Sequence, residues 1–293
     1  MTDFWQTVLD FAQATTARVG SQLLKEFGQV QATQGFAGGS SGTADKGVGA
    51  TDPNCLDFLG QAQKADGSLV TQADQWADRE IREAIAATFP GHGILSEEGE
   101  HIFFGTEWCW VIDPLDGTTN FTRGIPIWAI SLGLLYQGVP VFGYVYLPPL
   151  GQTFHGYWDG ANRFSQSNGA FLNHHPIHTS ADSPSNNHFF SLCSRSASML
   201  KPEFPCKFRM LGVASYNFLM VAAGATLGGV EATPKIWDIA AVWVIVQAAG
   251  GVWISLQKEP FPMQDGAEYG DRSYPTLVVS HAQLVPVFQP FMQ

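Results

Sequence analysis

Two carboxylates stand three residues apart in the segment WVIDPLDGTTNF, at Asp113 and Asp116. They directly follow an apolar run, Trp108–Ile112, that is typical of a buried strand. Two acids at the end of a buried strand are costly to hold together unless a cation lies between them. Because Pro114 restricts the backbone and Gly117 frees it, this turn can present both carboxylates and a backbone carbonyl to one hard cation. The alternative is an ordinary tight turn in which aspartate accepts local backbone hydrogen bonds.

Further acids could contribute to the same site, namely Asp74, the pair Glu97-Glu98 and Asp238. Several of them follow a predicted strand or open a predicted helix, where side chains can converge on a cleft. Oxygen ligands without histidine or cysteine favour Mg²⁺ or Mn²⁺ over zinc, and such an ion commonly joins a substrate phosphate. The competing interpretation is that Asp74 and Asp238 cap helix N-termini and that the two glutamates are solvated charges.

Length, charge and cysteine content limit the class of protein. The chain has 293 residues, 45% of them hydrophobic, which is enough for one large domain or two lobes with their own cores. A net charge of −11 argues against a nucleic-acid partner, although bound cations would still admit a phosphate. The cysteines lie far apart in the sequence, which disfavours a zinc site or a disulfide scaffold.

The N-terminal stretch MTDFWQTVLD lacks the apolar core of a signal peptide, and no apolar run in the sequence is long enough to span a membrane. We therefore expect a cytoplasmic protein without a membrane partner.

Hydrophobic periodicity predicts the elements that must position the acids. Helices are expected over residues 4–27, with Gly28 as the stop, and from about 72 or 74 to 89. Between them, the segment 34–63 is rich in Gly, Ala, Ser and Asp, and we interpret it as a flexible surface insertion. A short strand is expected at 93–95.

The remainder of the chain predicts a β-rich region followed by alternating strands and helices. Antiparallel hairpins are expected from 127–136 with 139–147 and from 152–158 with 163–171. Strands are then expected at 188–193, 207–211, 229–231, 252–255 and 276–280, and helices at 215–226 and 237–249. This order predicts an α+β / α/β fold, with an N-terminal α+β lobe over 1–178 that holds the metal site and a C-terminal α/β lobe over 179–293.

Four segments carry a family resemblance: GSLVTQAD at 67–74, ILSEEG at 94–99, WVIDPLDGTTNF at 110–121, and KIWDIAA from residue 235 with AGG at 249–251. In this order and spacing they resemble the inositol monophosphatase family of Mg²⁺-dependent, Li⁺-sensitive phosphatases. The resemblance covers most of residues 1–280, with 34–63 outside it. It implies a layered αβαβα sandwich of the sugar-phosphatase type and a homodimer.

The resemblance also implies roles for the matching residues. Two to three Mg²⁺ ions would be held by Glu97, Asp113, the Leu115 carbonyl, Asp116 and Asp238. Gly117 and Thr118 would give backbone N–H groups to the phosphate. Asp74 and Thr118 would orient and deprotonate the attacking water, with Glu97 counted among the catalytic groups.

Substrate recognition is implied for Asp116, Gly117, Thr118, Gly212, Val213, Ala214, Glu231 and Asp238. Glu231 stands where inositol-preferring relatives use a glutamate to accept hydrogen bonds from substrate hydroxyls, although it could be an ordinary strand-end acid. Val213 replaces the threonine of the family's Gly-Thr-Ala, which removes a hydroxyl. Arg195, within Ser194–Ser196, could meet a second phosphate or carboxylate, or be a solvated surface residue. The histidines at 174, 175, 178 and 188 are not expected to bind metal.

The sequence thus predicts a Mg²⁺-dependent phosphomonoesterase for a small polyol phosphate such as myo-inositol 1-phosphate. Histidinol phosphate, fructose 1,6-bisphosphate and a nucleotide 3′-phosphate are alternatives within the family. Two other classes stay open: a catalytically silent regulatory relative, and a protein in which the metal is purely structural.

Overall fold

The computed structural model describes residues 2–35, 62–63, 69–161, 163–164, 167–201 and 203–292. Most of the predicted insertion, residues 36–61, lies outside this range, as do residues 64–68, which include the first two residues of the first matching segment. The ends of the insertion that are described form a turn at 34–35 and strand β1 (Ala62–Gln63), which pairs with β2 (Leu69–Val70). Within the described residues, no helix combines the length and apolar character needed to cross a membrane.

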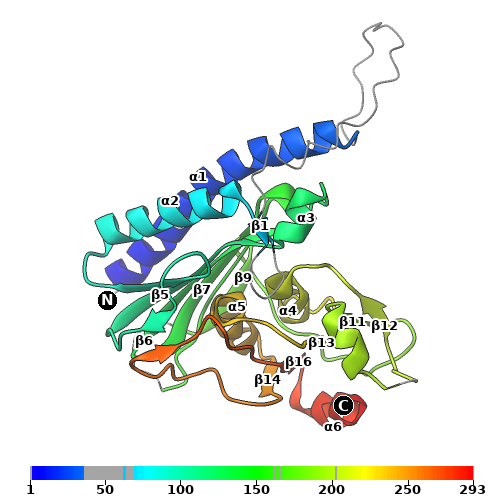
Figure 1. The fold of residues 1–293 in the computed structure, drawn as a ribbon. Coiled ribbons are helices and arrows are strands. Elements are labelled where there is room, and N and C mark those ends of the chain that lie inside the picture. Colours follow the sequence, from blue (N-terminus) through cyan, green and yellow to red (C-terminus); the bar gives the residue numbers. More distant parts are fainter. Residues whose placement is uncertain are drawn as a thin grey trace, which may run out of the picture.

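A seven-stranded sheet forms the first half of the molecule, in the spatial order β10-β9-β8-β7-β6-β5-β3 (Figure 1). Its strands are β3 (Gly93–Ser96), β5 (Trp108–Asp116), β6 (Ala129–Tyr136), β7 (Val139–Leu147), β8 (Gln152–Tyr157), β9 (Gly169–Leu172) and β10 (His175–Pro176). Neighbouring strands are antiparallel except β3 and β5, which run parallel. Since parallel strands end at the same side of a sheet, Glu97 and Asp113 are carried to one edge.

Two helices cover one face of this sheet, α1 (Thr2–Thr33) and α2 (Gln72–Thr88) (Figure 1). Their apolar stripes pack with the sheet's buried side chains in one cluster that includes Leu23, Ile81 and Trp110. Helix α1 runs past its predicted stop at Gly28, because Val30 in the following turn is also buried in this core.

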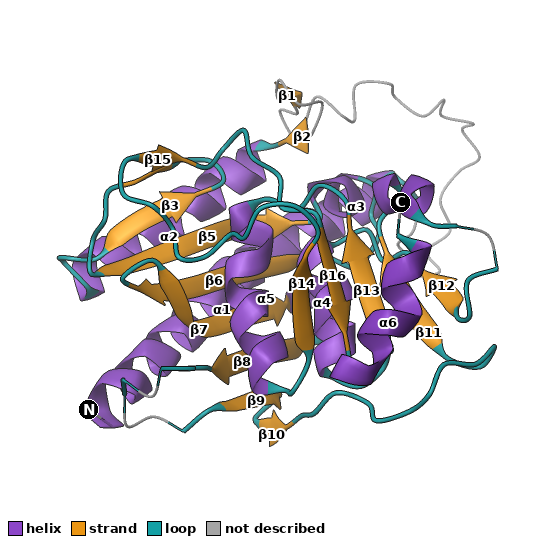
Figure 2. Cartoon of the chain, turned by 90° about the horizontal axis from the view of Figure 1, so that it is seen from below, coloured by secondary structure: helices purple, strands orange, loops and turns teal. Residues whose placement is uncertain are grey.

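The opposite face packs on α4 (Ala214–Ala222) and α5 (Ile236–Ala248), which lie between the first sheet and a second one (Figure 2). Helix α5 is apolar on nearly all sides, as expected for a helix buried in a middle layer. The helix packs closely on three glycines of the sheet, because a Cβ at any of them would come too close to α5; they are Gly133, Gly143 and Gly156.

The second sheet has five strands in the order β12-β11-β13-β16-β14. They are β11 (Phe189–Leu192), β12 (Lys207–Arg209), β13 (Gly228–Glu231), β14 (Val252–Ser255) and β16 (Thr276–Val279). Its outer face is covered by α6 (Val285–Phe288), where Phe288 packs with Phe190 and Leu277. The layers therefore alternate as αβαβα, which confirms the predicted sandwich. The division into lobes at residue 178 stays a prediction.

Small elements complete the chain. Helix α3 (Thr118–Thr122) follows β5, and β4 (Ile102–Phe103) pairs with β15 (Ala267–Glu268). Short 3-10 helices lie at Pro148–Leu150, Arg195–Met199, Ala282–Leu284 and Gln289–Phe291.

Besides the end of α1, three predicted boundaries were wrong by several residues. Strand β5 does not end at Ile112 but continues through Asp116, because it pairs with β6 again after a register shift. The last strand of the second hairpin begins at Gly169 instead of Arg163, because the carboxylate of Asp159 accepts hydrogen bonds from Ala161, Arg163 and Phe164 and holds these residues in a loop. Helix α4 ends at Ala222 and not at Thr226, since a Gly224 turn follows it.

The close packing of α5 on these glycines predicts that Gly143→Ala destabilises the protein. A Cβ at this position would overlap the backbone carbonyl of Ala241, so strand and helix must separate. We expect a loss of about 1–3 kcal/mol in the free energy of unfolding, measured by urea denaturation. Gly28→Ala is the control, because its Cβ would meet open space within α1; it should be neutral or stabilising by up to about 1 kcal/mol. Equal midpoints for Gly143→Ala and the native chain would contradict this account.

Candidate active site

The segment at the end of β5 is shaped by a break in strand pairing. The register between β5 and β6 shifts between Asp113 and Asp116, so both carboxylates lie at the sheet edge although both residues are buried. Gly117 follows with φ of 96°, a left-handed conformation that favours glycine, and a Cβ there would lie 2.7 Å from the Val213 side chain. Helix α3 then begins at Thr118, as the family resemblance implied.

A small cavity of about 170 Å³ lies at this edge. It is lined by Glu97, Asp113, Leu115, Asp116, Gly117, Thr118, Thr119, Gly212 and Asp238. Carboxylate oxygens of Asp113, Asp116 and Asp238 all lie within 4.8 Å of one another. The structure thus brings together, from β5, the turn after β3 and the start of α5, every residue that the sequence predicted as a metal ligand.

Backbone N–H groups hold the three clustered carboxylates in place. The N–H of Leu115 donates to Asp113 Oδ1 at 3.0 Å. Asp116 accepts from the N–H groups of Ala214 and Ser215, at 3.3 and 2.8 Å, and so ties β5 to the first turn of α4. The N–H of Lys235 donates to Asp238 Oδ2 at 2.8 Å.

Asp74 lies behind the pocket and is joined to it by Thr118. The Thr118 hydroxyl lies 2.8 Å from Asp74 Oδ1 and 3.1 Å from the Leu115 carbonyl, either of which can accept its hydrogen. The other Asp74 oxygen accepts from the backbone N–H and the hydroxyl of Thr71, the N-cap of α2. Burial raises the pKa of Asp74 to about 7, against these hydrogen bonds.

Electrostatics in the pocket call for a cation. Burial first, and then the neighbouring acids, raise the pKa of Asp113 and Asp238 well above the ordinary range for aspartate. Burial also raises the pKa of Asp116. Crowded carboxylates with oxygen-only donors fit one or more hard divalent cations such as Mg²⁺ or Mn²⁺.

A larger cavity of about 490 Å³ adjoins the acidic pocket and shares Asp116, Thr119, Gly212 and Asp238 with it. Its other lining residues are Asn120, Ile125, Ile127, Cys193, Ser194, Arg195, Met210, Leu211, Val213, Ala214, Glu231, Thr233 and Pro234. Burial raises the pKa of Glu231 well above the ordinary range for glutamate, and Asn217 donates to Glu231 Oε1 at 2.6 Å. All predicted substrate residues therefore line one or the other of two adjoining cavities.

Several residues at these cavities were missed from the sequence. Cys193 was counted only as an unpaired cysteine, yet it lines the larger cavity. Asn217 faces Glu231 from α4, and Asn120 binds the carbonyls of Ile127 and Leu211 and so fixes the approach to Gly212. A polar residue within an otherwise apolar helix was the available signal for Asn217. The histidines at 174, 175, 178 and 188 line neither cavity.

A layered αβαβα fold with an all-oxygen acidic pocket at a strand end is the arrangement of a metal-dependent phosphatase. The chain belongs to the inositol monophosphatase family, whose sequence pattern matches residues 5–284. This family is one of phosphatases that act on phosphate monoesters.

Characterised relatives differ in their substrates. The chain is 34% identical over 215 residues to a fructose-1,6-bisphosphatase/inositol-1-monophosphatase of Aquifex aeolicus, covering 69% of this chain and 78% of that protein. It is also 34% identical over 207 residues to a histidinol-phosphatase of Mycobacterium tuberculosis, covering 66% and 76%. The structure of the Thermotoga maritima IMPase superposes with a TM-score of 0.70 at 27% identity and covers 97% of each chain.

The crowding of acids predicts that Asp113→Asn stabilises the metal-free protein. A raised folded-state pKa means that ionisation opposes folding, so the penalty begins above the unfolded pKa near 4 and is complete above the folded pKa. At pH 8 in EDTA we therefore expect Asp113→Asn to gain about 1–2 kcal/mol in unfolding free energy. We also expect Mg²⁺ to raise the melting temperature of the native chain and to leave that of the variant unchanged. A variant less stable than the native chain in EDTA would contradict this.

Proposed function

We propose that this protein is a Mg²⁺-dependent phosphomonoesterase that acts on a small polyol phosphate, with myo-inositol 1-phosphate as the first candidate. The observation that carries the proposal is the contact between Asp74 and Thr118 at the wall of the acidic pocket. It places a base and a hydroxyl beside the site where a metal-held phosphate would lie.

The chain's own residues would position the reactants for in-line attack of water on phosphorus, in which the P–O bond to the alcohol breaks and the departing alkoxide takes a proton from solvent. When bound, Mg²⁺ would supply positive charge to the phosphate and lower the pKa of a bound water. Thr118 would orient the attacking water through its hydroxyl, and Asp74, with a pKa near 7, would accept the proton at its carboxylate. The backbone N–H groups of Gly117 and Thr118 would bind the phosphate oxygens.

The adjoining cavity would hold the alcohol part of the substrate. Its volume of about 490 Å³ suits a small ring or chain, and Glu231 offers an acceptor for hydroxyl hydrogens. Ile125, Ile127 and Met210 give the same cavity an apolar part. Histidinol phosphate, fructose 1,6-bisphosphate and a nucleotide 3′-phosphate therefore belong in the assay beside myo-inositol 1-phosphate.

Phosphate release from these four esters, with and without Mg²⁺, tests the proposal. We expect the highest kcat/KM with myo-inositol 1-phosphate and no release in EDTA. Higher kcat/KM with another ester would overturn myo-inositol 1-phosphate as the preferred substrate but keep the reaction class. Thermal stabilisation by Mg²⁺ with no phosphate release from any ester would favour the structural or regulatory reading.

Asp74→Asn should lower kcat by about 10²–10⁴-fold, since it removes the proposed general base. Asparagine has one acceptor oxygen where aspartate has two: it can keep the hydrogen bonds from Thr71, while its NH₂ group donates to the Thr118 hydroxyl, which can in turn donate to the Leu115 carbonyl. The fold and the Mg²⁺-induced rise in melting temperature should therefore persist. Asp159→Asn is the matched control, because Asp159 is also a buried acid but binds Ala161 and Phe164 away from both cavities. A kcat for Asp74→Asn equal to that of Asp159→Asn would exclude Asp74 as the base.

Glu231→Gln should weaken binding of hydroxyl-bearing substrates. The Asn217 hydrogen bond can be retained at Oε1, while the second carboxylate oxygen becomes an N–H₂ donor. We expect KM for myo-inositol 1-phosphate to rise roughly tenfold, the effect of about 1.4 kcal/mol of lost binding, with kcat little changed. KM for p-nitrophenyl phosphate, which has no hydroxyl to contact Glu231, should stay the same. Equal increases for both esters would contradict hydroxyl recognition by Glu231.

A further inference from the structure

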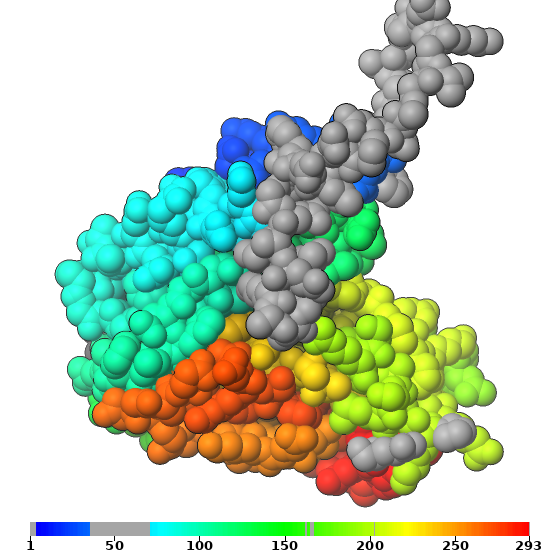
Figure 3. Space-filling model, viewed as in Figure 1, coloured from blue at the N-terminus to red at the C-terminus, as the bar shows by residue number. Residues whose placement is uncertain are grey.

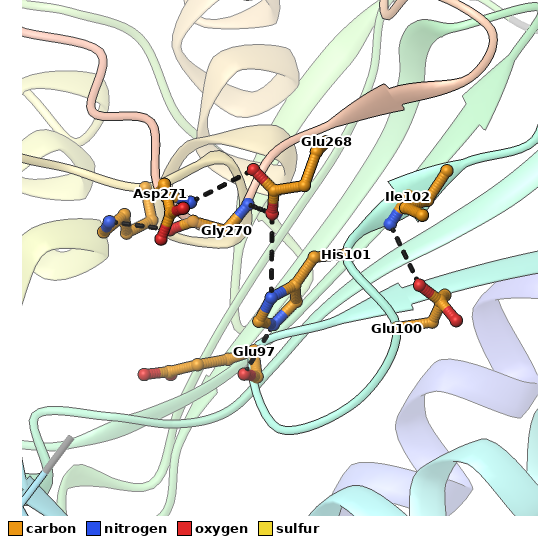
Figure 4. Close-up of polar contacts among 8 residues, drawn as sticks. Glu97, Glu100, His101, Ile102, Glu268, Gly270 and Asp271 are labelled. Carbon is orange, nitrogen blue, oxygen red and sulfur yellow. Dashed lines mark hydrogen bonds and ion pairs between the residues drawn. The ribbon is translucent and has the colours of Figure 1, made fainter. Parts of the chain in front are cut away.

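His101 lies between the turn that carries Glu97 and a loop from the far end of the chain. Its Nε2 is 2.9 Å from the Glu97 carbonyl oxygen, and its Nδ1 is 3.9 Å from Glu268 Oε1. Because a carbonyl oxygen only accepts, Nε2 carries the hydrogen of this bond. Figure 4 shows the ring between Glu97 and Glu268, with the Glu97 side chain extending away from it.

The imidazole is also packed on two further sides. Its ring centroid is 5.1 Å from that of Trp237, the residue before Asp238. Gly270 lies against the other side, and a Cβ at that position would overlap Nδ1. His101 therefore contacts the backbone of one proposed metal ligand, Glu97, and the side chain of Trp237, which precedes another, Asp238.

The loop that packs against His101, residues 267–270, also contacts the segment that carries Asp238. Strand β15 pairs with β4, and the N–H of Tyr269 donates to the His101 carbonyl at 2.9 Å. In the space-filling view, the orange stretch around β15 packs against the blue-green stretch around β4 (Figure 3). Lys235 Nζ donates to the Gly270 carbonyl at 2.7 Å, and the Lys235 backbone N–H binds Asp238 Oδ2.

We propose that His101 is a positioning residue for the metal site: its hydrogen bond and its packing against Trp237 and Gly270 fix the turn that carries Glu97 relative to Asp238. This inference rests on the proposed function, because it takes both acids as metal ligands. Glu97 follows the end of β3 in a turn, whereas Asp238 is held in the first turn of a helix. A turn holds its side chains less firmly than a helix does, and contacts from outside the ligand set orient metal ligands.

The test compares His101→Phe and His101→Gln in the full chain, with Mn²⁺ binding measured by titration calorimetry. Phenylalanine keeps a ring beside Trp237 and removes the N–H, so we expect Mn²⁺ affinity to fall at least tenfold. The Mg²⁺ concentration for half-maximal activity should rise by a similar factor, with kcat at saturating Mg²⁺ within about threefold of the native value. Glutamine places an amide N–H near Nε2 and should restore affinity to within about threefold.

His281→Phe is the matched control, because His281 Nε2 likewise lies within hydrogen-bond reach of a backbone carbonyl, that of Asp182, at 3.3 Å and away from the acidic pocket. It should bind Mn²⁺ as the native chain does. Should His101→Phe fail to fold, Gly270→Ala displaces the same ring and should weaken Mn²⁺ binding in the same way.

The outcomes separate this inference from the proposed function. Native affinity in His101→Phe or, failing that, in Gly270→Ala overturns the positioning role while the phosphatase proposal stands. Equal loss in the Phe and Gln variants, with lower melting temperatures in EDTA, shows a purely structural role. A native chain that binds no Mn²⁺ and releases no phosphate overturns the proposed function itself.

Discussion

Mutual repulsion among buried carboxylates is the constraint on which this structure depends. Asp113, Asp116 and Asp238 have oxygens within 4.8 Å of one another, in a setting that favours their neutral forms. Such an arrangement persists only if the surrounding fold fixes each group independently. Here each carboxylate accepts a backbone N–H, and these donors belong to three different segments. The fold thereby holds the three carboxylates together against their mutual repulsion. A cation bound between them would attract all three.

The middle helical layer is what makes this convergence possible. Asp238 is far from Asp113 in sequence, and it reaches the edge of β5 because α5 lies directly on the first sheet. Close approach depends on glycines in β6, β7 and β8, where side chains would hold the helix away. Asp116 adds a direct tie, since it accepts N–H groups from the start of α4. Core packing and site geometry therefore depend on the same contacts between sheet and helices.

The sequence predicted the helices and strands better than their boundaries. It also predicted the proposed metal ligands better than the residues that hold them in place. Apolar periodicity located β5 and α5, but the pairing of Asp116 with Ala129 depends on a register shift that periodicity does not record. Convergence of Asp113 and Asp238 came from the family resemblance, because spacing alone does not bring distant segments together. Asn217 and His101 act through tertiary contacts with Glu231 and Glu97. The polarity of Asn217 within an apolar helix was a weak local signal, and no local pattern marked His101.

The sequence presented helix capping and a place at the acidic site as competing interpretations of Asp74 and Asp238, yet each residue has both in the structure. Each carboxylate accepts, at Oδ2, a hydrogen bond from the backbone N–H at the start of its own helix. For Asp74 the other oxygen accepts from Thr118, and Asp238 is close enough for an oxygen to join the acidic cluster. A capped carboxylate has few rotamers left, so its orientation is fixed before any cation or water arrives. Capping is thus the means by which these two helices supply rigid acids to the site, and its presence is no argument against a functional role.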